Sequence, residues 1–211
     1  MYRELLELKF KRKVPLISAG TSIALPLLRD GQLPACVNHF RIGESAFIGT
    51  DLLNGDSLAG LRDDAFTLEV EVVEVKEKSM AASGETNGMM PFRSVATDAP
   101  EPGERGYRAI TTIGQLDTDV SELTPLDPNH RIVGASSDMT VVSLGANDGK
   151  ISVGESIKFR PSYGALVRLM LDKYVDKVVT PSVERFTKNV TDDREVDLPP
   201  VITESIKQLK D

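Results

Sequence analysis

The sequence predicts an α+β protein, with a fragment of an α/β layer at its start and a mostly β domain after it. The first fifty residues follow the order helix, strand, loop, helix, strand, which is typical of an α/β unit with parallel strands. Near residue 60 the pattern changes, and apolar residues begin to alternate with acidic ones. The later apolar runs are short and are separated by turns rich in Gly, Asp and Asn, which is typical of β structure.

The first fifty residues supply the α/β fragment. Residues 14–17 form an apolar run with the length of a buried strand, and small polar residues after it lead into an apolar segment that predicts a helix. Gly31 and Pro34 mark the turn before a second strand. The elements expected here are a helix at 2–11, a strand at 14–17, a helix at 23–28 and a strand at 37–42.

The rest of the chain predicts mainly β structure. Between residues 66 and 72 apolar side chains alternate with Thr and Glu, the pattern of a strand with one face in water. Further strands are expected at 107–113, 132–133, 140–144, 156–159 and 175–179. A helix is expected at 162–171, with Leu166, Leu169 and Met170 on its buried face, and residues 81–106 predict a long loop. The resulting parts are a partial β/α segment at 1–58, a β-rich domain at 59–180 and a polar tail at 181–211 with a short helix at 202–209.

Charge and composition exclude several classes of function. The chain has 211 residues and a net charge of −7, so it lacks the positive charge that attracts nucleic acid or anionic lipid. The single cysteine, Cys36, rules out an intrachain disulfide and a CxxC zinc cluster, and it fits a reducing compartment. The basic run at 9–13 precedes an uncharged stretch that Pro15 and Pro26 interrupt and that is too short to span a bilayer. We therefore expect a cytoplasmic protein without membrane or nucleic-acid partners.

A run of small residues follows the first expected strand. Ser18, Gly20, Thr21 and Ser22 leave room for backbone N–H groups to approach a phosphate, with the Ser22 hydroxyl as a further donor. The alternative is an ordinary strand-to-helix turn in which Thr or Ser caps the helix.

Arg41 and Gly43 follow the second expected strand. Active-site residues of α/β proteins gather at strand ends, and Gly43 permits close approach of a ligand. The alternative is a surface Arg before a Gly turn. His39 and His130 lie too far apart in the sequence to suggest a metal site, so no metal is expected.

The β-rich part carries two weaker candidates. Ser136, Ser137 and Asp138 follow a short strand and could pair a nucleophile with an acid, but the GxSxG motif and a placed His are missing, so a plain turn is the alternative. Tyr163 could direct its phenol into a site or pack at a helix start.

Taken in order, these segments resemble the C-terminal part of the pyridoxal-phosphate-dependent alanine racemase superfamily, and most of all its ornithine-type amino-acid racemases. Residues 17–22 are similar to the family's Ser-Gly-Gly-Asn-Ser phosphate loop, with Ala19 in place of a Gly and Thr21 in place of the Asn. Residues 41–44, Arg-Ile-Gly-Glu, resemble the family's strand end. Residues 132–138 and 163–166 resemble its β-domain strand and the segment of its phosphate-binding Tyr.

The resemblance implies a fold, a cofactor and site residues. The fold would be the end of a (β/α)8 barrel followed by the family's β domain, and the cofactor would be pyridoxal 5′-phosphate. Arg41 would face the pyridine nitrogen and keep it unprotonated, because two positive groups in contact repel. The cofactor-binding residues implied are Ser18, Gly20, Thr21, Ser22, Arg41, Ile42, Gly43, Glu44 and Tyr163. The catalytic residues implied are Gln115, Ser136, Ser137 and Asp138, and the strand that carries the last three would reach the active site of the partner subunit.

The chain also departs from the family. Gln115 stands where alanine racemases have a catalytic Tyr, and Ser136-Ser137-Asp138 where they have Cys-Met-Asp, which argues against simple alanine racemisation. A full barrel needs about 200 residues, and only about fifty precede the β domain here. The family's Schiff-base lysine lies on the first barrel strand, and no lysine of this chain has a matching position.

Three functions therefore remain open. The chain could be the portion of a racemase that interconverts L- and D-amino acids of ornithine-like or related structure, completed by a Lys-bearing barrel half. It could instead be a non-catalytic protein that binds another phosphorylated ligand, or a structural subunit that serves dimerisation. Because an open barrel layer exposes strand edges and apolar surface, we expect a homo-oligomer or a complex with a complementary barrel-bearing subunit.

Overall fold

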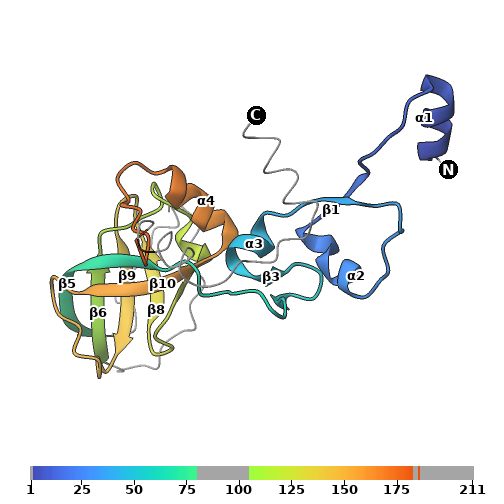
Figure 1. Ribbon diagram of the computed structural model, residues 1–211. Coiled ribbons are helices and arrows are strands. Elements are labelled where there is room, and N and C mark those ends of the chain that lie inside the picture. The colour runs from blue at the N-terminus through green and yellow to red at the C-terminus, as the bar shows by residue number, and fades with distance from the viewer. Residues whose placement is uncertain (1, 80–104, 183–184, 186–211) are drawn as a thin grey trace, which may run out of the picture. The chain divides into compact units, whose positions relative to one another are not determined.

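The computed structural model describes residues 2–79, 105–182 and 185 (Figure 1). The expected loop at 81–106 lies outside the described residues except for its last two, which belong to a strand. The expected tail at 181–211, with its helix at 202–209, lies outside them apart from residues 181, 182 and 185. The chain divides into two units, Met1–Asp172 and Lys173–Asp211. The predicted boundaries near residues 58 and 180 stay predictions.

The first unit begins with the expected α/β fragment. Its elements are α1 (Tyr2–Phe10), β1 (Ser18–Thr21), the 3₁₀ helix η1 (Ser22–Ala24), α2 (Leu25–Arg29) and β2 (His39–Arg41). The two strands pair in parallel, with Gly20 opposite Phe40 and Thr21 opposite Arg41. The order helix, strand, helix, parallel strand is confirmed.

The first strand lies later in the chain than expected, and the prediction of a strand at 14–17 is wrong. Pro15 has no N–H group to donate to a strand ladder. The Asn38 side chain instead serves this segment, because its Oδ1 accepts from the Ile17 N–H at 2.8 Å and its Nδ2 donates to the Pro15 carbonyl at 2.8 Å. These two bonds hold the segment beside the start of β2 without a ladder.

A short connection joins the two parts of the unit. It contains α3 (Glu44–Ile48) and a two-stranded hairpin of β3 (Thr50–Asp51) and β4 (Asp56–Ser57). Asp51 accepts hydrogen bonds from Asn54 and from the Leu53 N–H, and the Asn54 side chain is the largest cause that lowers the pKa of Asp51. The helix α3 was not expected from the sequence, since five residues show too little periodicity to be recognised.

The β-rich part is a six-stranded sheet in the order β7-β10-β5-β6-β9-β8, with antiparallel neighbours. The alternation seen in the sequence is confirmed, because Leu68, Val70 and Val72 are buried while the intervening Glu69 and Glu71 are exposed. A 3₁₀ helix, η2 (Val120–Glu122), precedes the short edge strand β7. The strands are β5 (Leu68–Ser79), β6 (Arg105–Thr111), β7 (Leu123–Pro125), β8 (Arg131–Ala135), β9 (Thr140–Gly145) and β10 (Ser156–Pro161).

The helix α4 (Tyr163–Leu171) follows β10 directly (Figure 1). It buries Ala165, Leu166 and Leu169. Met170 is 53% exposed, so its expected place in the core is wrong. The buried face is centred between Ala165 and Leu169, and Met170 lies past its edge.

In the second unit, the prediction of a strand at 175–179 is wrong. These residues have no regular secondary structure. Val178 and Val179 are 85% and 61% exposed, so no partner strand covers the apolar side chains that suggested a strand.

The α+β class predicted from the sequence is confirmed by a parallel strand pair with its helices and an antiparallel sheet. No helix within the described ranges is long and apolar enough to cross a bilayer.

Candidate functional site

Ser22 joins the ends of the two parallel strands. It follows β1 directly and is only 5% exposed. Its Oγ accepts from the backbone N–H groups of Gly43 and Ser45, each at 3.3 Å, just after β2 ends. Two segments about twenty residues apart therefore meet at one hydroxyl. Because that oxygen already accepts two bonds, the hydroxyl hydrogen is available for an acceptor outside the cluster.

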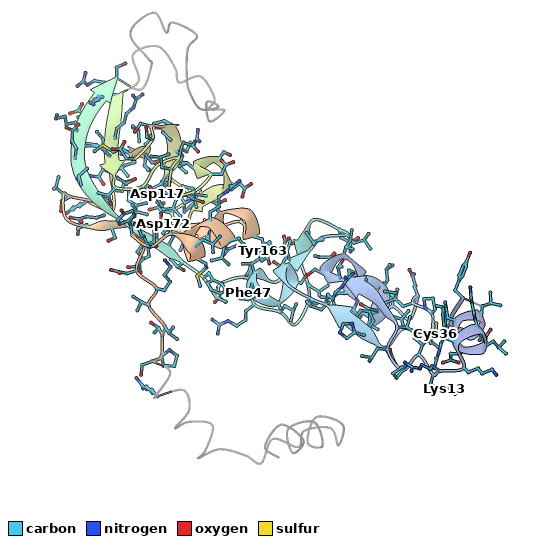
Figure 2. All side chains as sticks on the ribbon, turned by 90° about the horizontal axis from the view of Figure 1, so that it is seen from above. Lys13, Cys36, Phe47, Asp117, Tyr163 and Asp172 are labelled. Carbon is cyan, nitrogen blue, oxygen red and sulfur yellow. The ribbon has the colours of Figure 1, made fainter. Side chains whose placement is uncertain are left out.

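The Tyr163 phenol reaches the same place from the β-rich part. A Cβ atom at Gly43 would lie 3.2 Å from the Tyr163 Oη, so the missing side chain at Gly43 is what makes room for the hydroxyl. In Figure 2, Tyr163 and Phe47 mark where α4 and α3 meet. Within the part of the chain that the structure describes, the Tyr163 hydroxyl makes no hydrogen bond. Ser22, Gly43 and Tyr163, three of the candidates taken from the sequence, thus lie together.

The segment 18–22 is not the loop expected. Ser18–Thr21 is strand β1, and Gly20 is buried against the Phe40 ring. The alternative of a side-chain cap is wrong too, because Thr21 stands at the N-cap of η1 but its side chain makes no capping bond. The loop interpretation failed because Gly20 is used for the contact between strands and not for conformational freedom.

The remaining candidates surround Gly43. Arg41 is exposed at the end of β2, Ile42 is half-buried, and Glu44 is the first residue of α3. At the start of α3 the N–H groups of Gly43 and Ser45 already donate to the Ser22 Oγ, and those of Ala46 and Phe47 donate to the Gly43 carbonyl, which leaves the Glu44 N–H to donate outward. The donors of this cluster are hydroxyls and a backbone amide, which suits a phosphate group.

A second cluster lies at the end of the β sheet. The Gln115 N–H donates to the Ser136 carbonyl at 3.0 Å, and the Leu116 N–H donates to the Ser137 carbonyl at 2.8 Å. Gly114 makes this possible, because a Cβ atom there would overlap the backbone of Ser137 and Asp138. The structure thus brings Gln115 together with the segment 136–138.

The side chains of this cluster are held locally. The Ser136 Oγ lies 3.3 Å from Asp138 Oδ1 and accepts from the Met139 N–H at 3.2 Å, which is the arrangement of a turn. The Gln115 Oε1 accepts from the Val120 N–H at 3.4 Å. Among the described residues no group of His, Cys, Asp and Glu could hold a metal ion.

An open groove runs beside this second cluster, and Figure 2 shows Asp117 and Asp172 at it. The Asp117 side chain is hydrogen-bonded within its own loop, because its Oδ2 accepts from the Gly114 N–H at 2.8 Å. Arg168 faces Asp119 across 3.8 Å. The groove is lined by Gln115, Leu116, Asp117, Thr118, Asp119, Arg168, Leu171 and Asp172.

Sequence reasoning missed Ser45, whose N–H donates to the Ser22 Oγ, and the pair Ser162 and Glu122, which are hydrogen-bonded to each other at the start of α4. Ser45 and Glu122 carry no motif that could have singled them out. Ser162 did offer a signal, since a Ser directly before an apolar periodic segment is a frequent N-cap.

Comparison with curated proteins finds relatives of the chain that are amino-acid racemases. The chain is 36% identical over 178 residues to an ornithine racemase of Acetoanaerobium sticklandii, a match that covers 82% of this chain and 48% of the relative. The chain resembles the amino-acid racemases of the alanine racemase superfamily. A lysine racemase of Thermotoga maritima is 34% identical over 181 residues, which covers 86% of this chain and 50% of that protein. The chain thus spans about half the length of the curated relatives it matches.

Two further comparisons were made. No family model matches the chain. Among solved structures, a biosynthetic alanine racemase from Pseudomonas aeruginosa gives a TM-score of 0.48 at 15% identity and covers 79% of this chain and 44% of that one. A D-threonine aldolase from Filomicrobium marinum gives 0.46 at 15% identity and covers 76% and 37%.

Proposed function

We propose that the chain supplies the cofactor-phosphate pocket and the β domain of a pyridoxal-phosphate-dependent racemase for a basic amino acid. The observation that carries the proposal is the meeting of Ser22, Gly43 and Tyr163. The relatives are named as racemases of ornithine and lysine, both amino acids with a cationic side chain, which supports that substrate class. The reaction interconverts the L and D forms of a small amino-acid substrate.

In this proposal the chain's own residues bind and orient. The Ser22 and Tyr163 hydroxyls and the backbone N–H of Glu44 would donate to the phosphate, and Arg41 would face the ring nitrogen. When bound, the cofactor withdraws electrons from the carbon that exchanges its proton. The positive charge of Arg41 would keep the ring nitrogen unprotonated and so limit that withdrawal.

The second cluster completes the site from a neighbouring subunit. Gln115, Ser136, Ser137 and Asp138 would line the substrate side of the partner's pocket. The amide of Gln115 does not exchange a proton as a phenol does, so its role there would be to hold the substrate. The racemase would be cytoplasmic, since a single cysteine suits a reducing compartment.

A Lys-bearing barrel half is the further component that the proposal requires. The exposed apolar face of α1 offers a surface for it, since Tyr2, Leu5 and Leu6 lie on one side of the helix and are 78%, 56% and 48% exposed. A helix with such a face is stable mainly when the face packs against another element. The proposal also requires a second copy of the chain, whose second cluster would line the pocket of the first copy.

Borohydride trapping tests whether this chain carries the reactive lysine. We expect reduction in the presence of pyridoxal phosphate, followed by peptide mass mapping, to label no single lysine preferentially in the folded chain. Surface lysines would react weakly and evenly, because an amine becomes a strong nucleophile only in a desolvating pocket or beside another cationic group. Strong labelling of one lysine would show that the chain needs no other barrel half, and the portion proposal would be wrong.

Two substitutions test the pocket. We expect Arg41→Ala to weaken binding of both pyridoxal phosphate and pyridoxal about tenfold, since it removes a charged hydrogen bond. Tyr163→Phe should weaken binding of pyridoxal phosphate about fivefold and leave pyridoxal unchanged, because only the phosphate contact is lost. Equilibrium titration followed by absorbance measures both effects.

Matched controls are available on the β sheet. Arg131→Ala removes an exposed arginine of β8, and Tyr107→Phe removes a phenol hydroxyl of β6. Both control variants should bind like the wild type. Equal affinity of Arg41→Ala, Tyr163→Phe and the controls would remove the pocket assignment.

A further inference from the structure

We infer that Glu122 is a positioning residue that sets the Tyr163 phenol at Gly43. This role deepens the proposed function, and the part of its test that measures binding of pyridoxal phosphate rests on that function. Glu122 ends η2, directly before β7 begins. Because Leu123 of β7 pairs with Pro161 of β10, the next residues outward, Glu122 and Ser162, come face to face.

The contact between Glu122 and Ser162 uses both backbone and side chain. The Ser162 N–H donates to the Glu122 carbonyl at 2.9 Å. The Ser162 hydroxyl donates to the Glu122 Oε2 at 2.5 Å and accepts from the Ala165 N–H at 3.2 Å. Ser162 therefore caps α4 while its hydroxyl hydrogen points at a carboxylate. A hydrogen bond to an ionised group is about twice as strong as a neutral one, so the carboxylate orients the cap.

Gly164 shows how closely the carboxylate lies against α4. A Cβ atom at Gly164 would be 2.5 Å from Glu122 Oε2 and 3.3 Å from Oε1. A second bond from the same loop reinforces the contact, since the buried Thr118 Oγ1 donates to the Ala165 carbonyl at 3.3 Å. The first turn of α4 is thus held on two sides.

The geometry links this contact to the pocket. Tyr163 lies between Ser162 and Gly164 in the sequence, so both of its neighbours touch Glu122. Its own side chain points the other way, to Gly43 beside Ser22. The position of the phenol is therefore determined by where Glu122 holds the helix start. Loss of the carboxylate removes one of the two side-chain contacts that hold the first turn, so the hydroxyl is less firmly placed at Gly43.

Fluorine NMR of the chain labelled with 3-fluorotyrosine tests the inference without any ligand. The chain has four tyrosines, and Tyr163→Phe assigns the signal of interest. We expect Glu122→Ala to shift and broaden that signal, and Glu122→Gln, which keeps an acceptor oxygen, to change it much less. Gly164→Ala should act like Glu122→Ala, because its methyl group displaces the carboxylate.

A matched control separates this role from a general loss of a surface hydrogen bond. The Glu155 Oε2 accepts from the N–H and the hydroxyl of Ser152 in a turn outside α4. Glu155→Ala should leave the Tyr163 signal unchanged. If Glu122→Ala does not fold, Ser162→Ala removes the same bridge from the other side and gives the same reading. An unchanged Tyr163 signal in these variants overturns the inference.

Ligand titration distinguishes this inference from the proposed function. Glu122→Ala should lower the affinity for pyridoxal phosphate about fivefold and leave pyridoxal unchanged. The double variant with Tyr163→Phe should lose no more than Tyr163→Phe alone, since coupled residues are not additive. Additive losses would overturn the inference. If the wild type binds neither pyridoxal phosphate nor inorganic phosphate while the fluorine signal still responds to Glu122, the proposed function fails and the positioning role stands.

Discussion

Gly114→Ala should destabilise the β-rich part by about 3 kcal/mol, which is more than a hundredfold in the unfolding equilibrium. A Cβ atom at Gly114 would overlap the backbone nitrogen of Asp138 and the carbonyl of Ser137. Backbone atoms held in a turn cannot move aside as the end of a long side chain can. The two loops would separate, and the bonds from Gln115 and Leu116 to the segment 136–137 would be lost.

Urea unfolding followed by circular dichroism measures this loss. Gly134→Ala is the matched control, because a Cβ atom there would meet no atom within 4 Å and Gly134 does not have a positive φ. We expect the control to unfold within about 0.5 kcal/mol of the wild type. If Gly114→Ala were as stable as Gly134→Ala, the two loops would not be in contact, and the second cluster would have to be abandoned.

The β-rich part could be predicted from sequence because its signal is local. In β5 each buried residue is followed by an exposed one, so period two appears directly in the letters. The Ser162 cap and the apolar spacing of α4 are equally local. The strand expected at 175–179 shows the limit of this reasoning. An apolar run becomes a strand only when a partner accepts its backbone bonds, and Val178 stays exposed.

The failures in the first fifty residues have a different origin. The segment 14–17 is held by Asn38, whose partners Ile17 and Pro15 lie 21 and 23 residues away. Period and propensity describe neighbours in the chain and carry no information on such contacts. The same reason explains why only part of the pocket could be predicted from the sequence. The motifs pointed to Ser22, Gly43 and Tyr163, but Glu122 lies 40 residues from Ser162 and belongs to no motif.

Gly20→Ala is expected to weaken binding of pyridoxal phosphate more than tenfold while leaving the β sheet folded. Gly20 pairs with Phe40 across the two parallel strands, and a Cβ atom at Gly20 would overlap the Phe40 ring. The ring must move or the strands must separate, which costs about 2 kcal/mol. Either change alters the end of β2 and takes Gly43 away from the Ser22 Oγ. We expect a loss of affinity of more than tenfold by titration.

A second substitution shows whether the ring is the cause. In Gly20→Ala combined with Phe40→Leu, the smaller side chain leaves room for the added methyl group, so part of the affinity should return. Phe40→Leu alone should bind nearly as well as the wild type, because Phe40 is not among the donors of the pocket. Full binding by Gly20→Ala would contradict the assignment, since the strand pair would then not determine where Ser22 and Gly43 meet. Recovery of affinity in the double variant would show that the contact between Gly20 and the Phe40 ring sets the distance between Ser22, after β1, and Gly43, after β2.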